Sequence, residues 1–188
     1  MKKEIFFPEF DIGDYILRKI RVEDIGKVFT GLSHPDVIAY YGVSYDSLEA
    51  TNEQMIWYEQ ILAESRGIWW GIAKRADNEL VGACGLNDWL PAHRKIHVGY
   101  WLLPEYWGQG IAANALPLIL RYAFKEMNVH RIHADVEPEN LASSNLLQKL
   151  GFVHEGTLRE VECKNQEYVS LMQFSLIESD PGAIALES

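Results

Sequence analysis

The 188-residue sequence has few cysteines, less positive than negative charge, and no long hydrophobic run. Its two cysteines, Cys84 and Cys163, lie far apart and without metal-ligand spacing, which argues against a disulfide framework and against a zinc site. No apolar run reaches the length of a membrane span, and the N-terminal segment has acidic residues within its short apolar patch, unlike a signal peptide. These absences predict a cytoplasmic protein with no metal site and no membrane partner.

The charge balance bears on the kind of partner. The sequence has 17 Lys and Arg residues against 27 Asp and Glu residues, which gives a formal net charge of −10. This excess of negative charge argues against direct nucleic-acid binding, which requires a positively charged surface. It favours cationic partners such as amines or basic peptides through a modest steering field. Solubility alone would explain the same composition.

Hydrophobic periodicity predicts one mixed α/β domain over residues 1–178 and a disordered tail over residues 179–188. A hydrophobic content of 48% is enough for one substantial core. The expected order is an antiparallel start, a β-α-β-α-β core and a closing hairpin that turns at Lys164 and Asn165. Strands are expected at Tyr15–Ile20, Ile68–Lys74, Glu79–Leu86, Lys95–Leu103, Arg131–Val136, Phe152–Glu162 and Tyr168–Ile177, and helices at Asp24–Leu32, Leu48–Ala63, Ile111–Met127 and Leu141–Leu150.

The stretch Gly99–Ala115 combines the end of a strand, a glycine turn and the start of a helix. The turn carries Gly108 and Gly110, and the helix begins near Ile111. Glycines let several backbone N–H groups point at one spot, and the helix dipole adds partial positive charge there. The pattern predicts a phosphate site, although glycine before a helix is also ordinary turn chemistry.

A second segment, Glu139–Phe152, reads ENLASSNLLQKLGF and is predicted to be a capped helix. Asn140 is a good N-cap, and Gly151 is well placed to end the helix. Cap chemistry explains most of this pattern. Cap chemistry does not explain why this helix is paired with an earlier glycine turn that follows a strand.

Together the two segments resemble the GNAT superfamily of acyl-CoA-dependent N-acyltransferases, and within it the RimJ/RimL-type group that acetylates the N-termini of ribosomal proteins. The resemblance extends from Tyr15 to about Ile177. It implies the GNAT-type α/β fold: a mixed, mostly antiparallel sheet of about seven strands, splayed between strands 4 and 5 and flanked by about four helices. The residues that carry it are Gly99-Tyr100-Trp101-Leu102, Pro104 through Ala112, Ala123-Phe124, Asn140, Ser143, Lys149, Gly151 and Phe152.

The resemblance also implies that acetyl-CoA is the cosubstrate, and where it binds. Backbone N–H groups of the glycine turn would hold its pyrophosphate, and the pantetheine arm would lie between the strands Lys95–Leu103 and Arg131–Val136. The implied binding residues are Trp101, Leu102 and Leu103 on the strand, Trp107, Gly108, Gln109, Gly110, Ile111 and Ala112 in the turn and helix start, and Asn140 and Ser143 in the second segment.

The implied reaction is attack of a neutral amine on the thioester, helped by a base, a backbone donor for the oxyanion and a partner for the leaving thiolate. Many members carry a tyrosine acid at the position of Leu147, so Ser143 becomes the best thiolate partner here; support of the helix start would also explain Ser143. The rival bases are Glu162, where RimL-type proteins carry a proposed catalytic glutamate, and His97, whose imidazole titrates near neutral pH.

The leading interpretation is transfer of an acetyl group to the N-terminal α-amine of a protein or peptide by direct attack in a ternary complex. One alternative keeps the chemistry but uses a small amine, such as a polyamine, amino acid, aminoglycoside or aminoacyl-nucleotide. Another is a non-catalytic acyl-CoA sensor, because the usual tyrosine and acidic positions are altered. Tyr40, Trp57 and Trp89 are expected to line the acceptor groove, although core packing would also explain them. The oligomeric state is left open, with a homodimer as one candidate.

Overall fold

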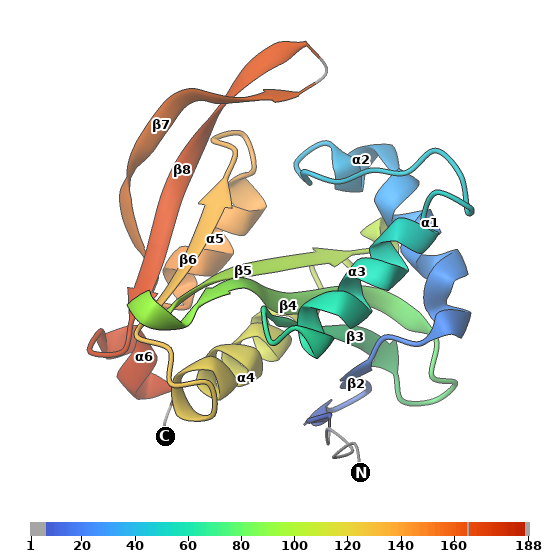
Figure 1. The fold of residues 1–188 in the computed structure, drawn as a ribbon, viewed down its shortest axis with the longest axis horizontal. Helices are drawn as coiled ribbons and strands as arrows, with labels where there is room; N and C mark the ends of the chain where they lie inside the picture. The colour runs from blue at the N-terminus through green and yellow to red at the C-terminus, as the bar shows by residue number, and fades with distance from the viewer. Residues whose placement is uncertain (1–6, 165, 187–188) are drawn as a thin grey trace.

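The computed structural model describes residues 7–164 and 166–186, and within them eight strands form one sheet (Figure 1). The order across the sheet is β1-β2-β3-β4-β5-β6-β8-β7. Neighbouring strands are antiparallel except for the pair β5 and β6, which is parallel. The strands are β1 (Phe10–Ile12), β2 (Tyr15–Lys19), β3 (Ile68–Lys74), β4 (Leu80–Leu90), β5 (Lys95–Leu102), β6 (Arg131–Val136), β7 (Val153–Lys164) and β8 (Glu167–Ile177).

The predicted fold class is confirmed, with one more strand and two more short helices than expected. The added elements are β1, α2 and α6. The helices of the described residues are α1 (Ile25–Ser33), α2 (Pro35–Ile38), α3 (Asn52–Ala63), α4 (Ile111–Lys125), α5 (Leu141–Lys149) and α6 (Pro181–Ala185), with short 3-10 helices η1 (Val22–Asp24), η2 (Pro91–His93) and η3 (Pro104–Tyr106). None of these helices is long and apolar enough to cross a membrane.

Each face of the sheet has its own hydrophobic core, because successive side chains of a strand point to opposite faces. On one face, α4 and α5 pack against residues such as Ile96 and Val98 of β5. On the other face, α1 and α3 pack against residues that include Trp69 of β3 and Trp101 of β5. Strand β5 therefore presents alternate residues to two different layers of helices.

The expectation of a disordered tail over residues 179–188 is corrected, because part of this segment forms helix α6. Helix α6 begins with Pro181 at its first turn, and its Ala183 is buried in the core. Gly182 lies so close to Gly151 that a Cβ on Gly151 would come within 2.6 Å of the Gly182 Cα atom. This backbone contact joins two segments distant in sequence, so the short-range pattern did not predict it. Residues 187–188 of the expected tail lie outside the described residues.

Other boundaries shifted for local reasons. Helix α1 ends at Ser33, one residue beyond the end expected for this helix, and Pro35 starts α2, since proline is well suited to the first turn of a helix. Helix α3 starts at Asn52 instead of Leu48. Strand β4 continues to Leu90, through residues expected to form a loop. The predicted turn at Lys164 and Asn165 includes Asn165, which lies outside the described residues.

Candidate active site

The main cleft of the molecule lies where β5 and β6 diverge. Their parallel pairing joins Lys95–His97 to Arg131–His133 and goes no further, so the residues of β5 after His97 separate from β6. A cleft of about 880 Å³ occupies this opening. It is bordered by α2, β5, β6 and the first turns of α4 and α5, and it reaches both faces of the sheet.

The glycine turn forms one end of this cleft. Gly108 and Gly110 have φ angles of +72° and +77°, a region that favours glycine, and Gly110 is the N-cap of α4. A Cβ on either glycine would have no atom within 4 Å, so the space beside the turn is open. The described residues that line the cleft include no Lys or Arg. A bound diphosphate would therefore be held by backbone N–H groups and the positive end of the α4 dipole.

Two side chains of the turn fold back onto the backbone. The Trp107 indole, which is 47% exposed, donates a hydrogen bond of 2.8 Å to the Leu102 carbonyl, and the Gln109 amide donates one of 2.7 Å to the Glu105 carbonyl. These bonds fix the shape of the turn. Trp107 lines the cleft together with Ile111 and Ala112, whereas Gln109 is not among the described lining residues.

The end of β5 offers backbone groups to the opening. The Leu103 N–H donates to the Val81 carbonyl at 2.9 Å, so it points toward β4. Since backbone groups alternate between the two edges of a strand, those of Leu102 and Tyr100 point toward the diverged edge. Trp101 and Leu102 line the cleft, whereas Leu103 is 1% exposed and packs in the core.

Tyr100 and Ser143 meet on the α5 side of the cleft. Their hydroxyl oxygens are 2.6 Å apart, and the backbone N–H of Ser143 donates to the Asn140 side chain at 3.1 Å. Burial raises the pKa of Tyr100 to about 12, although its hydrogen bond to Ser143 acts in the opposite direction. From the sequence alone, Tyr100 was named only as part of a motif. Side chains alternate between the two faces of a strand, so the sequence could have predicted that Tyr100 lies on the face of the sheet opposite to His97.

His97 lies on the other face, beside two residues of β6. Its Nε2 atom is 3.9 Å from an Asp135 carboxylate oxygen, and its ring centroid is 5.0 Å from that of His133. Burial lowers the pKa of His97, partly opposed by the negative charges of Asp135 and Asp88. Burial and the nearby His97 also lower the pKa of His133, to about 4. His97 is therefore a neutral imidazole near pH 7. Asp135, which also lines the cleft, was missed by sequence reasoning.

Aromatic side chains form one wall of the cleft. Tyr40 and Trp57, which were expected to line an acceptor groove, line the cleft, and Trp69 joins them. The Trp69 ring lies over two glycines, since a Cβ on Gly85 would come within 2.2 Å of it and one on Gly99 within 3.0 Å. The sequence predicted Trp69 only as a strand residue. Gly85 and Gly99 on the neighbouring strands were the available indication that a large ring lies over them.

Trp89 and Glu162 are not among the described residues that line the cleft. Trp89 lies in β4 and packs against the core of the α4 face, and it is not among the described residues that line the cleft. Glu162 pairs with Val169 in the outer part of the β7–β8 hairpin, which extends beyond β6 (Figure 1). Its side chain is exposed and it too is absent from the described lining.

The same hairpin nevertheless reaches the rim of the cleft. The Lys164 ammonium forms an ion pair of 2.7 Å with Glu137, which follows β6. It also donates to the carbonyl of Ala39, at the end of α2. Lys164 thus connects the residues that follow α2 to the residues that follow β6.

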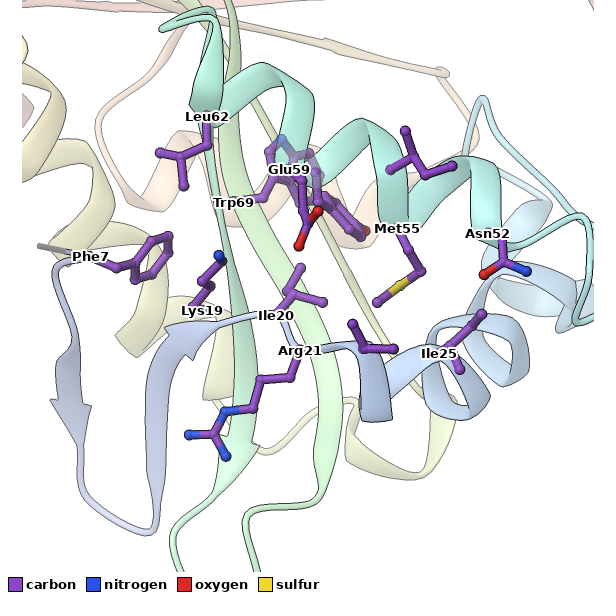
Figure 2. A pocket seen from close by; sticks show the side chains of 13 residues that line it. Phe7, Lys19, Ile20, Arg21, Ile25, Asn52, Met55, Glu59, Leu62 and Trp69 are labelled. Carbon is purple, nitrogen blue, oxygen red and sulfur yellow. The ribbon is translucent and has the colours of Figure 1, made fainter. Parts of the chain in front are cut away.

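A second, smaller hollow lies between α3 and β2 (Figure 2). Its volume is about 160 Å³. In Figure 2, Met55 and Glu59 point from α3 toward Lys19, the last residue of β2, and Ile20, which follows it. It contains neither the glycine turn nor His97, so the larger cleft is the candidate active site.

Comparison with known protein families identifies the family of this chain. A family model described as "Acetyltransferase (GNAT) domain" matches residues 14–153, well over half of the chain. The chain belongs to the GNAT acetyltransferase family. It is an acetyl-CoA-dependent N-acetyltransferase, and the open glycine turn and diverged strands provide a place for acetyl-CoA as acyl donor.

Several relatives resemble this GNAT chain over most of its length. The uncharacterized N-acetyltransferase YoaA of Bacillus subtilis (strain 168) is 32% identical over 92% of this chain and 98% of its own. A ribosomal-protein-S5-alanine acetyltransferase from Vibrio fischeri has a TM-score of 0.81 at 22% identity, covering 92% of this chain and 98% of that one. A spermidine N-acetyltransferase from Vibrio cholerae, solved with CoA and spermine, has a TM-score of 0.78 at 23% identity, covering 89% and 97%. The two structures support the fold.

Proposed function

We propose that this N-acetyltransferase acts on the N-terminal α-amine of a protein or peptide, by direct attack on acetyl-CoA in a ternary complex. The observation that carries the proposal is the single cleft that joins the glycine turn on one side to His97 and the aromatic wall on the other. An open groove of this size accommodates an extended chain end. The similar fold of the S5-alanine acetyltransferase supports the proposal.

The charges of the cleft favour a cationic acceptor. The described lining residues include Asp36 and Asp135 but no Lys or Arg. Negative charge attracts an amine that is protonated in solution, and a base then makes it nucleophilic. The same charges would suit a substrate with a second positive group, so a small polyamine is the second candidate. The fold of the spermidine N-acetyltransferase supports that alternative.

We assign the role of base to His97. Its ring is neutral near pH 7, because burial lowers its pKa, and it lines the cleft on the acceptor side. An α-amine has a pKa near 8, so a proton has to be removed for attack. Asp135, 3.9 Å away, would stabilise the imidazolium that results. Backbone N–H groups on the diverged edge of β5 would face the thioester oxygen, where negative charge develops.

An acceptor screen tests the proposed function. CoA release would be measured with a peptide that has a free N-terminus and contains lysine, with the same peptide acetylated at its N-terminus, and with spermidine. We expect the highest kcat/KM for the free peptide and little turnover of the blocked one. Turnover of spermidine alone would establish the second candidate. Tight acetyl-CoA binding with no CoA release from any amine would instead indicate an acyl-CoA sensor.

The pH profile tests the role of His97. In the wild type, kcat is expected to rise with pH through a limb below pH 6.5, because a base must lose its proton before it acts and burial lowers this pKa. His97→Gln is expected to remove that limb and lower kcat by about 100-fold or more. Glu162→Gln is the comparison variant and is expected to retain both the limb and most of the activity. The opposite result for the two variants would make Glu162 the base.

A further inference from the structure

The side chain of Asn87 lies beside His97, on the face of the sheet that also carries Trp69. Asn87 of β4 pairs with His97 of β5, and directly opposed residues of an antiparallel pair have their Cβ atoms about 5 Å apart on the same face. Both residues line the cleft. The chemistry assigned above makes no use of Asn87.

A β-bulge directs the carboxylate of the next residue toward Asn87. Two residues of β4, Asp88 and Trp89, lie opposite the single residue Ile96 of β5, so β4 has one residue more than its partner here. Asp88 has a φ of +56°, in the left-handed region. Neighbouring side chains of a regular strand point to opposite faces, and the bulge breaks this alternation. The Asp88 carboxylate therefore reaches the Asn87 amide, whose nitrogen donates a hydrogen bond of 2.6 Å to it.

This hydrogen bond fixes which end of the Asn87 amide is turned away from Asp88. An ionised carboxylate only accepts hydrogen bonds, so the amide NH2 group faces Asp88 and the amide oxygen faces the other way. The oxygen lies over β5, since a Cβ on Gly99 would be 4.0 Å from Asn87 Oδ1 and 3.0 Å from the Trp69 ring. Of the residues that the structure describes, none donates a hydrogen bond to Oδ1. The oxygen is thus an available acceptor on the side of the cleft that carries His97.

The chemistry of this oxygen indicates which group it contacts. It is uncharged and accepts hydrogen bonds without donating any. The acetyl group and the thioester contain no N–H or O–H group, so neither can use it. An ammonium has three N–H groups, and at least one N–H remains on the nitrogen after His97 has removed a proton. The amino group of the acyl acceptor therefore fits the Asn87 oxygen.

We propose that Asn87 binds the acceptor amine, with Oδ1 accepting a hydrogen bond from the same nitrogen that gives a proton to His97. Asp88 is a positioning residue, because it holds the amide with its oxygen away from the carboxylate. Two contacts on one nitrogen fix its place beside the thioester better than one contact does. An uncharged acceptor also avoids holding the amine in its protonated, unreactive form, as a carboxylate would. This role rests on the proposed function, since it requires an amine next to His97.

Kinetics of a variant of similar shape test the contact. Asn87→Leu removes the oxygen, and it is expected to lower kcat/KM for the amine by about 10- to 100-fold, the value of a hydrogen bond to a charged group. The Kd of acetyl-CoA should change by less than about threefold, because the acyl group has no use for the oxygen. Asn52→Leu is the matched control. Asn52 donates at 3.1 Å to the Glu49 carbonyl, outside the described lining of the cleft, and its replacement should leave kcat/KM unchanged.

Two variants at Asp88 separate positioning from a structural role. In Asp88→Asn the new side-chain oxygen can still accept from the Asn87 amide, and asparagine tolerates a positive φ, so KM for the amine should stay near the wild-type value. Asp88→Gly also tolerates this φ but leaves the amide free to turn over, so KM should rise by about 3- to 10-fold. Both variants remove the same charge. An equal rise in both would overturn the positioning role of Asp88.

A binding experiment tests Asn87 without acetyl transfer. Enzyme saturated with CoA would be titrated with the free peptide of the acceptor screen and with its desamino analogue, in which hydrogen replaces the amino group. Spermidine and its desamino analogue would be compared in the same way. The wild type should bind the amine at least about tenfold more tightly than the analogue. In Asn87→Leu this ratio should be lower by about tenfold, while the affinity for the analogue should be unchanged.

The outcomes separate this inference from the proposed function. Unchanged kcat/KM in Asn87→Leu would overturn the role of Asn87, and so would a loss of acetyl-CoA affinity with an unchanged KM for the amine. Absence of CoA release by the wild type with every amine would contradict the proposed function. The binding comparison would still decide whether Asn87 binds an amino group, because an equal ratio of Kd values in the wild type and Asn87→Leu would overturn it in either case.

Discussion

Replacement of Gly110 by aspartate is expected to weaken the binding of acetyl-CoA by at least about 100-fold, or about 2.7 kcal/mol. Gly110 caps α4, and the space beside its Cα is open, so the new carboxylate would occupy the place of the diphosphate. Like charges about 4 Å apart near a protein surface repel by about 4 kcal/mol. Isothermal titration of acetyl-CoA into the variant measures the loss.

Gly110→Asn is the matched control. Asparagine has nearly the shape of aspartate, is equally suited to an N-cap and tolerates the φ of +77° found here, but carries no charge. The loss of affinity in Gly110→Asn should stay below about tenfold, because asparagine occupies the same space as aspartate but does not repel the diphosphate. Equal losses in both variants would indicate steric obstruction, and unchanged affinity in Gly110→Asp would place the diphosphate elsewhere.

Asp24→Asn is expected to lower the free energy of unfolding by about 3 to 5 kcal/mol. The Arg18 side chain is only 2% exposed and forms two hydrogen bonds to the Asp24 carboxylate, of 2.7 and 2.9 Å. Asn78 accepts two more from the same guanidinium. Neutralising Asp24 leaves a buried positive charge without its counter-ion. Urea unfolding of the wild type and the variant measures the difference.

Two comparison variants make this prediction specific. Arg66→Met breaks an exposed ion pair with Glu64 and should cost at most about 1 kcal/mol, since solvent screens such pairs. The double variant Arg18→Met with Asp24→Leu should lose less than Asp24→Asn, because no unpaired charge remains buried. A loss in Asp24→Asn as small as that in Arg66→Met would show that the buried pair adds no more than an exposed one.

The helix starts at the glycine turn and at Asn140 were predictable because they depend on neighbours in the sequence. Gly110 and Asn140 have cap signals within a few residues of the helices they start, and the structure places both where those signals indicate. The break before Pro35 has the same local origin. The divergence of β5 from β6 entered through the resemblance of the two motifs to a family, and the pairing that ends at His97 agrees with it.

Predictions that depended on distant packing were less complete. Trp89 and Tyr40 are both aromatic and both follow turn signals, yet Tyr40 borders the cleft while Trp89 lies in an extended β4 and packs against the core. Glu162 lies in the β7–β8 hairpin and is not among the described residues that line the cleft. No local pattern distinguishes these outcomes, because each depends on the path of a strand relative to elements far away in sequence.

The sequence by itself determined the family, the acyl donor and the glycine turn before α4, since these are carried by short motifs whose geometry is local. Only the tertiary structure decided which side chains face one another across the cleft. His97 meets Asp135, and Tyr100 meets Ser143, because β5 leaves β6 after three paired residues and sends alternate side chains to opposite faces of the sheet. Such contacts join residues far apart in sequence, and packing of the whole sheet fixes them.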